Sequence, residues 1–255
     1  MAKRKRVMNV EKMLKEGQGQ GIGSAYKPWI RIQDVPSLGR VTRLKGIKTC
    51  RQHEFLSDLE RNFFYILEYS DVVIDIREQF PLLPLEETIL ISKKLGIEHP
   101  KNPDTEEFVV MTTDFFITLN LNKGKIEVAR TLKYKDDLLN KRVIEKYEIE
   151  RMYWKNRGVD WSIVTEIDID KYIANNISYI HGYSDITDLD CFVNIGKHEL
   201  RHIIYEFVKR IIDSNKTMRS ICNEFDNDMC LEKGSALSLF KYLIINKIYN
   251  SKNRC

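Results

Sequence analysis

Three polar residues near the middle of the chain have types and spacing that could bind a metal ion and position a water molecule. Asp114 lies within an apolar run that begins at Val109, and Thr131 and Lys133 end a second run. Both runs are rich in Val, Ile, Thr and Phe, and the turn at 122–124 between them predicts a hairpin of two strands. A carboxylate inside a buried strand is costly unless it is paired or bound to a cation. Side chains two residues apart on a strand point to one face, so Thr131 and Lys133 are expected to share a face.

The same residues also have a plain structural interpretation. Asp114 could be a core acid with satisfied hydrogen bonds, and Lys133 could lay its aliphatic part along the sheet while its amine reaches solvent. Thr131 carries a hydroxyl but no charge. From these three residues alone, catalysis and structure both remain open.

The flanking sequence predicts the elements that would position such a site. Residues 54–68 have apolar positions at a helical period, and Glu60 flanks that stripe, where it could reach the rim of a cleft. A strand over 72–76 precedes the hairpin, and a charged helix over 139–154 and a strand over 159–165 follow it. This order predicts an α/β fold, a mixed central sheet with helices on both faces.

Two other segments are predicted to lack regular structure. Residues 30–48 are polar and basic and are expected to wrap over a surface, while Pro100 and Pro103 are expected to break any element within 85–107.

The glycine-rich run at 17–23 follows a polar helix instead of a strand, which excludes a nucleotide-binding loop and favours a flexible hinge that could lie against DNA.

Charge is distributed unevenly along the chain. Residues 1–53 carry thirteen Lys or Arg and three acids, a net charge of +10, whereas the remainder carries 28 basic and 34 acidic residues, a net charge of −6. A basic N-terminal segment on an acidic body favours an anionic polymer as partner. We therefore predict that DNA contacts the basic arm Lys3, Arg4, Lys5 and Arg6.

Composition predicts a soluble protein of the cytoplasm. Hydrophobic residues make up 43% and charged residues 31%, and no apolar stretch approaches the roughly 20 residues that span a bilayer. The five cysteines are odd in number and have no Cys-x-x-Cys spacing, which favours reduced thiols.

The segment His198-Glu199-Leu200-Arg201-His202 matches the zinc-hydrolase pattern His-Glu-x-x-His and offers a different function. In the helix predicted over 198–213, however, both histidines fall nearly opposite the apolar stripe. We interpret them as a solvated helix face, with a zinc hydrolase as the less favoured alternative.

An Asp on one strand and an x-x-Lys on its neighbour form the skeleton of the PD-(D/E)xK nucleases, and Asp114 and Lys133 fit it. In this chain Thr113 stands in place of the motif's proline, and Thr131 stands in place of its second acid. Over residues 15–165 the chain resembles the TnsA family, the endonuclease subunits of heteromeric cut-and-paste transposases. The resemblance rests on Tyr26-x-Pro28-Trp29 after the glycine-rich run, Leu56-Ser57-Asp58-Leu59-Glu60, Asp75 to Pro84, Thr113-Asp114-Phe115, and Lys133 with the residues from Arg142 to Trp154.

The resemblance implies a restriction-endonuclease-like core that hydrolyses the 5′ ends of the transposon, the non-transferred strand. It implies Glu60 and Asp114 as ligands of Mg²⁺, for which Mn²⁺ would substitute, and Lys133 as the catalytic lysine. Further ligands would be the main-chain carbonyl of Leu132, the Thr131 side chain and Glu150. An inactive DNA-binding or assembly subunit with the same fold is the alternative that Thr131 leaves open.

The resemblance implies three partners: double-stranded DNA at the transposon ends, a DDE transposase of the TnsB type and an AAA+ ATPase of the TnsC type. Binding to a membrane is not expected. The predicted organisation is a basic arm and glycine-rich segment over 1–53, a nuclease core over 54–167, and a helical domain over 168–255 that docks the ATPase. A winged helix is one form that this last domain could take.

Overall fold

The computed structural model describes residues 10–34 and 40–248, which form two compact units that meet between Ala174 and Asn175. The sequence placed this division at 167/168; the unit boundary lies within helix α5 (Lys171–His181). The predicted DNA-binding residues Lys3, Arg4, Lys5 and Arg6 lie outside the described residues.

A four-stranded sheet forms the centre of the N-terminal unit, in the order β3 (Val73–Pro81), β4 (Thr112–Leu121), β5 (Gly124–Leu132) and β6 (Asp160–Val164). β4 pairs antiparallel with β3 and β5, and β6 runs parallel to β5. The tight β4–β5 turn places Leu121 opposite Gly124, whose φ of 119° favours glycine. The parallel pair needs a long crossover, which η3 (Lys135–Leu139) and α4 (Lys141–Asn156) supply. The predicted mixed sheet and its hairpin are confirmed.

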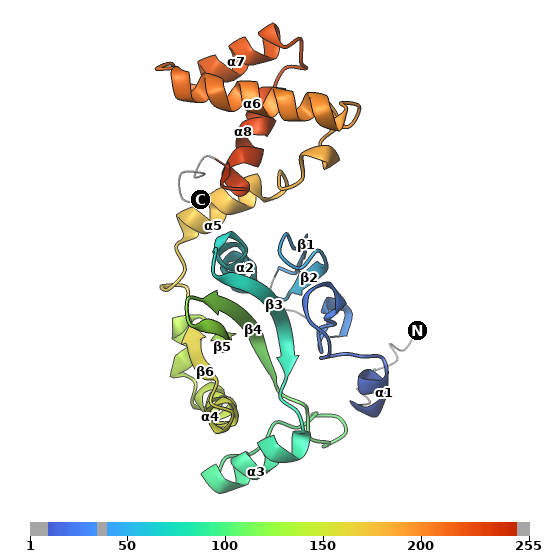
Figure 1. The fold of residues 1–255 in the computed structure, drawn as a ribbon. Helices are drawn as coiled ribbons and strands as arrows, with labels where there is room; N and C mark the ends of the chain where they lie inside the picture. The colour runs from blue at the N-terminus through green and yellow to red at the C-terminus, as the bar shows by residue number, and fades with distance from the viewer. Residues whose placement is uncertain (1–9, 35–39, 249–255) are drawn as a thin grey trace, which may run out of the picture. The chain divides into compact units, whose positions relative to one another are not determined.

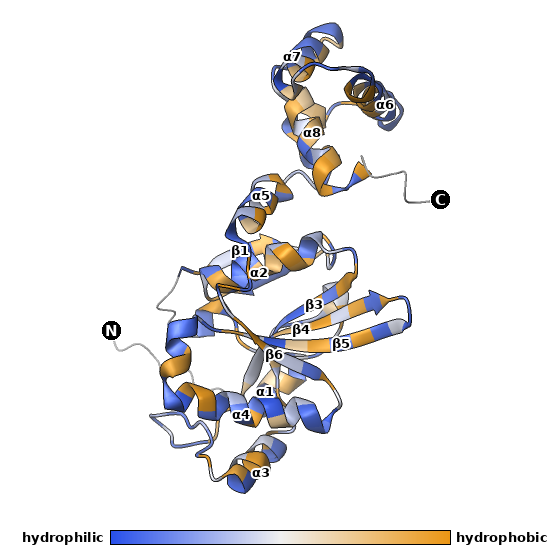
Figure 2. Cartoon of the chain, turned by 90° about the vertical axis from the view of Figure 1, so that its left-hand side faces the viewer, coloured by the Kyte–Doolittle hydropathy of each residue, from blue (hydrophilic) through white to orange (hydrophobic). Residues whose placement is uncertain are grey.

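Helices cover both faces of this sheet (Figure 1). α2 (Asp58–Tyr69) buries Leu59, Phe64 and Leu67 against the face that carries Phe115 and Ile117. On the opposite face, α4 packs against Phe116 and Ala129 through Ile149, Tyr153 and Trp154, and Ile91 of α3 (Leu85–Leu95) belongs to the same core. Figure 2 shows hydrophobic residues along β4 and β5, and the consecutive residues Phe115 and Phe116 are both buried because they face opposite sides of the sheet.

One strand was not predicted from the sequence, and one segment that was predicted to lack regular structure contains a helix. Residues 30–48 contain a strand, β1 (Thr42–Lys45), which forms a two-stranded hairpin with β2 (Gln52–Phe55), so α2 begins only at Asp58, after the Ser57 N-cap. The segment 85–107 contains helix α3, because its two prolines lie beyond the helix end at Gly96. Acids in the first turn of α3 and lysines in its last turn favour this helix through the helix dipole.

The glycine-rich segment is packed against the sheet, so its interpretation as a flexible hinge is wrong. It follows α1 (Val10–Lys15) and leads through η1 (Gly23–Ala25) toward η2 (Ile32–Asp34). A Cβ at Gly19 would lie 2.3 Å from Cγ of Pro81 in β3, and the Gly23 N–H donates to Oδ1 of Asp75 at 3.1 Å. Glycine is needed here because the backbone approaches β3 closely.

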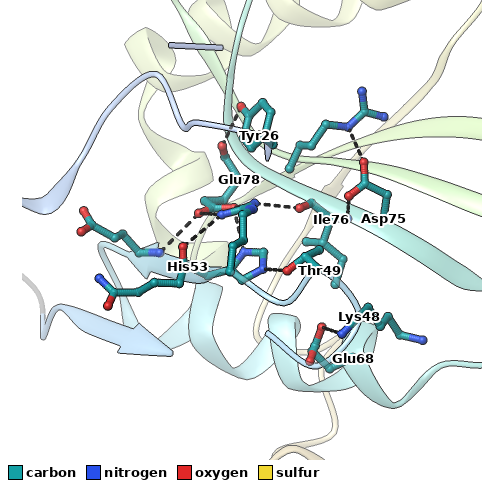
Figure 3. A network of polar contacts seen from close by, with 12 residues as sticks. Tyr26, Lys48, Thr49, His53, Glu68, Asp75, Ile76 and Glu78 are labelled. Atoms are coloured by element: carbon teal, nitrogen blue, oxygen red, sulfur yellow. Dashed lines mark hydrogen bonds and ion pairs between the residues drawn. The ribbon is translucent and has the colours of Figure 1, made fainter. Parts of the chain in front are cut away.

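A buried polar network joins β2 and the N-terminal segment to β3 (Figure 3). Glu78 is fully buried and accepts from both terminal nitrogens of Arg51, one of them at 2.7 Å, and contacts Nδ1 of His53 at 2.8 Å. Nε2 of His53 contacts the Thr49 hydroxyl at 2.7 Å, and the Tyr26 hydroxyl donates to the Glu78 carbonyl at 3.0 Å. Both oxygens of the Glu78 carboxylate therefore have buried partners, as a charge at this depth requires.

The C-terminal unit is helical. After α5 come η4 (Ile186–Asp188), η5 (Asp190–Phe192), α6 (Lys197–Asp213), α7 (Met218–Asp228) and α8 (Ser235–Ile245), packed around Phe207 and Phe225. The Asp226 carboxylate accepts from the main-chain N–H groups of Gly234 and Ala236, both at 2.7 Å, which caps α8. Residues 175–248 contain no strand and hence no wing. Within the described ranges, no helix is long and apolar enough to cross a bilayer.

Candidate active site

Asp114 lies on β4 between the strands on either side of it. Its Oδ2 accepts from the main-chain N–H of Leu132 on β5 at 2.6 Å, and its Oδ1 accepts from the side-chain amide of Gln79 on β3 at 3.3 Å. The side chain is partly buried. Each carboxylate oxygen has two lone pairs, so Asp114 keeps acceptor capacity for a cation after both bonds are made.

Glu60 is positioned by the first turn of α2. Ser57 is the N-cap, and its hydroxyl accepts from the Glu60 N–H at 3.2 Å while donating to Oε1 of Glu60 at 2.7 Å. Oε2 accepts from the Leu56 N–H at 3.1 Å. This arrangement is a variant of the capping box in which the main-chain donor is Leu56, the residue before the N-cap, and it fixes the carboxylate at the helix N-terminus where the helix dipole stabilises negative charge.

Asp114 lies near enough to Glu60 and to Lys133 for its charge to interact with theirs. Burial raises the pKa of Glu60 above its usual range, and the nearby charge of Asp114 raises it further. Burial also raises the pKa of Asp114, while the Leu132 N–H, the Gln79 amide and the charge of Lys133 act in the opposite direction. An acid whose ionisation is disfavoured by a neighbouring carboxylate belongs to a pair that a cation would stabilise.

Lys133 follows the last residue of β5, and its main-chain N–H donates to the Val164 carbonyl at 3.1 Å. Its ammonium lies 3.2 Å from Oδ2 of Asp137 in an ion pair whose side chains are 36% and 52% exposed. An ion pair this exposed contributes only about 0–1 kcal/mol, so the amine can leave Asp137 for another anion at little cost.

Thr131 and Glu150 form a second layer behind the two acids. Oε1 of Glu150 accepts from the Thr113 hydroxyl at 2.6 Å, from the Thr131 hydroxyl, and from the indole N–H of Trp161 at 3.0 Å. Both Thr131 and Glu150 are buried, at 3% and 1% exposure. Burial raises the pKa of Glu150 to about 7, and the charge of Asp114 adds to the effect. Glu150 is therefore a buried acid close to Asp114 and not a solvated helix-face charge.

Gln79 is the residue of this site that the sequence analysis missed. It is 3% exposed and has a φ of 49°, in the left-handed region that disfavours residues other than glycine, Asn and Asp. Glu78 and Gln79 are two consecutive polar residues in a strand, a pattern that is typical of a solvent-exposed stretch. Hydrophobic periodicity therefore could not identify Gln79 as a buried residue.

The zinc alternative has no comparable geometry. His198, Glu199 and His202 are exposed on α6, whereas Leu200, Ile203 and Phe207 are buried, which confirms that the histidines lie on the solvent face. Among the described residues, no group of three or more His, Cys, Asp or Glu side chains is arranged to hold a metal ion.

At Glu60 and Asp114, two side-chain carboxylates would need main-chain, water or substrate oxygens to complete a cation's coordination, and such hard oxygen donors suit Mg²⁺.

Comparison with known proteins gives matches in both units. The model of the TnsA-like endonuclease N terminal matches residues 70–166, and that of the TnsA endonuclease C terminal matches residues 168–250. The transposition protein TnsA of transposon Tn7 from Escherichia coli is 34% identical over 256 residues, covering 97% of this chain and 89% of the relative. With these matches along nearly its whole length, the chain belongs to the TnsA family of transposition endonucleases.

Proposed function

We propose that the chain is the subunit that cuts the 5′ ends of a transposon, the non-transferred strand, by Mg²⁺-dependent hydrolysis of a DNA phosphodiester. The observation that carries this proposal is the setting of Asp114 on β4, held by Gln79 and the Leu132 N–H, with Glu60 and Lys133 near enough for their charges to interact with its own. Its cellular setting would be the bacterial cytoplasm.

Glu60 and Asp114 would hold the cation, and Mn²⁺ would substitute for Mg²⁺. The main-chain carbonyl of Leu132 is a further oxygen ligand in this proposal, because the Leu132 N–H already fixes that peptide against Asp114. Thr131 and Glu150 bond to each other, so they support the ligands from behind instead of coordinating directly. When bound, the cation would lower the pKa of water and stabilise charge on the attacked phosphate.

Lys133 would act on the reacting groups. Its ammonium would hydrogen-bond the attacking water and offset the negative charge that grows on the phosphate oxygens. The water oxygen forms a bond to phosphorus while the bond to the 3′ oxygen breaks. The water loses a proton to solvent and the leaving oxygen gains one, which gives a 5′-phosphate and a 3′-hydroxyl.

Other subunits would supply what this chain lacks. Within the described residues no element is identified that reads base edges, so the choice of transposon end would come from a DDE transposase of the TnsB type. The helical C-terminal unit would dock an AAA+ ATPase of the TnsC type, and the N-terminal basic arm would contact DNA phosphates.

The test is cleavage of a duplex that contains a transposon end, in the presence of the partner transposase and Mg²⁺. Asp114→Ala is expected to lower the nicking rate by more than about 100-fold, because losing a ligand exceeds the 10–100-fold typical of residues behind the ligands. Asp160→Ala, which removes an exposed acid on β6, is the matched control and should cut normally. If the parent chain binds DNA and its partner but never cuts with Mg²⁺ or Mn²⁺, it is an assembly subunit and this proposal is wrong.

A further inference from the structure

The side chain of Gln79 connects the two acids. Its amide nitrogen donates to Oδ1 of Asp114 at 3.3 Å, and the same side chain lies close enough to Glu60 to act against the rise in the pKa of that carboxyl group. The amide oxygen accepts from the Thr112 hydroxyl at 3.1 Å, which fixes the orientation of the group, because a flipped amide would turn its oxygen toward two carboxylates. One buried amide therefore donates to Asp114 and lies beside Glu60.

The backbone of Gln79 is held in an unfavourable conformation by neighbouring contacts. Its φ of 49° costs about 1–2 kcal/mol for a residue with a Cβ. The carbonyls on both sides of that dihedral are engaged, since the Tyr26 hydroxyl donates to the Glu78 carbonyl at 3.0 Å and the Trp29 N–H donates to the Gln79 carbonyl at 3.2 Å. Tyr26 and Trp29 are almost fully buried, at 3% and 0% exposure. Strained residues held in this way by their surroundings cluster at functional sites.

A neutral donor suits this position. Two nearby carboxylates repel each other, and an N–H donor beside them reduces that repulsion before a cation arrives. A lysine or arginine would stabilise the pair more strongly but would oppose the entry of a divalent cation through its own charge. The amide holds the acids in place without competing for their site.

We infer that Gln79 is a positioning residue of the metal site: its amide holds Glu60 and Asp114 in the arrangement that receives the cation, and Tyr26 and Trp29 fix its backbone for that role. The inference rests on the proposed function, in which these two acids are the ligands. It also gives the packed N-terminal segment a purpose in catalysis, because that segment supplies both backbone contacts.

The experiment measures the binding of Mn²⁺ to the full-length protein by loss of the free-ion EPR signal. Gln79→Met keeps the unbranched shape and removes the amide, whereas Gln79→Gly also removes the backbone strain. Both variants should bind Mn²⁺ about 10–100-fold more weakly than the parent chain, the range typical of residues that orient metal ligands. Thr112→Val, which leaves the amide unoriented, should cause a smaller loss. Glu106→Gly changes an exposed residue with a φ of 57° and should bind normally.

The outcomes separate this inference from the proposed function. If Asp114→Ala abolishes Mn²⁺ binding while both Gln79 variants stay within twofold of the parent chain, the acids form the site but the amide does not position them, and the inference is wrong. If Asp114→Ala leaves Mn²⁺ binding unchanged, the proposed metal site fails and the inference falls with it. Thermal unfolding checks each variant, and Gln79→Gly keeps the test decisive if Gln79→Met does not fold.

Discussion

Removing the charge of Glu78 is expected to destabilise the N-terminal unit strongly. Burial alone would raise the pKa of Glu78, but the hydrogen bonds and charges of Arg51 and His53 outweigh it and lower the pKa from 4.5 to about 2. At about 1.4 kcal/mol per pKa unit, the difference corresponds to about 3 kcal/mol of unfolding free energy at neutral pH. Breaking a buried ion pair by removing one partner costs about 3–5 kcal/mol, which agrees.

Glu78→Gln should therefore lower the unfolding free energy by about 3 kcal/mol at pH 7, and the melting temperature by about 6–12 °C for a unit of this size. The assay is urea unfolding followed by tryptophan fluorescence. It reports this unit alone, because all three tryptophans lie in it: Trp29, Trp154 and Trp161.

The pH dependence has a definite sign. A carboxyl group with a lowered folded-state pKa stabilises the fold above its unfolded-state pKa, and that stability is lost as the pH falls through the folded-state value. The difference between the parent chain and Glu78→Gln should be constant above about pH 5 and shrink between about pH 4.5 and 2.

A surface ion pair provides the matched control. Glu148→Gln removes the partner of Arg151 in a pair at 2.6 Å whose side chains are 43% and 35% exposed, and it should cost less than about 0.5 kcal/mol. If Glu78→Gln lowers the unfolding free energy by less than about 1 kcal/mol, the inference that this network holds β2 against β3 is wrong.

Three further predictions concern the rest of the unit. Because burial raises the pKa of Glu150 to about 7, Glu150→Gln should gain stability relative to the parent chain as the pH rises from 5 to 8, measured by urea unfolding at each pH. Lys146→Gln should weaken DNA binding and reduce the salt slope by about one, because the pKa of Lys146 is lowered by burial and by neighbouring cations, which favours a phosphate partner; fluorescence anisotropy at several salt concentrations measures this. Gly19→Ala should lower the melting temperature far more than Gly23→Ala, because a Cβ at Gly19 meets Pro81 whereas one at Gly23 meets open space, although both glycines have positive φ.

The sequence predicted the fold well where periodicity reflects burial. The hairpin of β4 and β5 and the helices α2, α4 and α6 all pack apolar stripes against a core, and their existence was readable from spacing. α3 was missed because two prolines beyond its end were assigned to its interior. β1 and β2 were missed because each has only four residues and a polar sequence.

The candidate site was predictable only in part. Asp114 and Lys133 follow from strand spacing, whereas Glu60 needed the family resemblance, since its capping-box contacts alone look structural. Three consecutive polar residues are typical of an exposed segment. At Arg77, Glu78 and Gln79, however, all three are buried, at 6%, 0% and 3% exposure. Their partners come from distant segments, and no local pattern identifies such partners.

At the position of Thr131 on β5 the nuclease motif has an acid. In this chain a carboxyl group reaches that place from α4 instead, on Glu150. A carboxylate on β5 at that position would stand beside Asp114, and a third buried negative charge would be costly without a bound cation. Here the Thr131 hydroxyl bonds to Glu150, which reaches the same place from α4 and keeps its charge one layer further back. With a pKa of about 7, Glu150 can carry a proton at neutral pH and so adds little repulsion between the acids in front of it. The motif is incomplete along β5, but the fold supplies its third carboxyl group from the helix that crosses to β6.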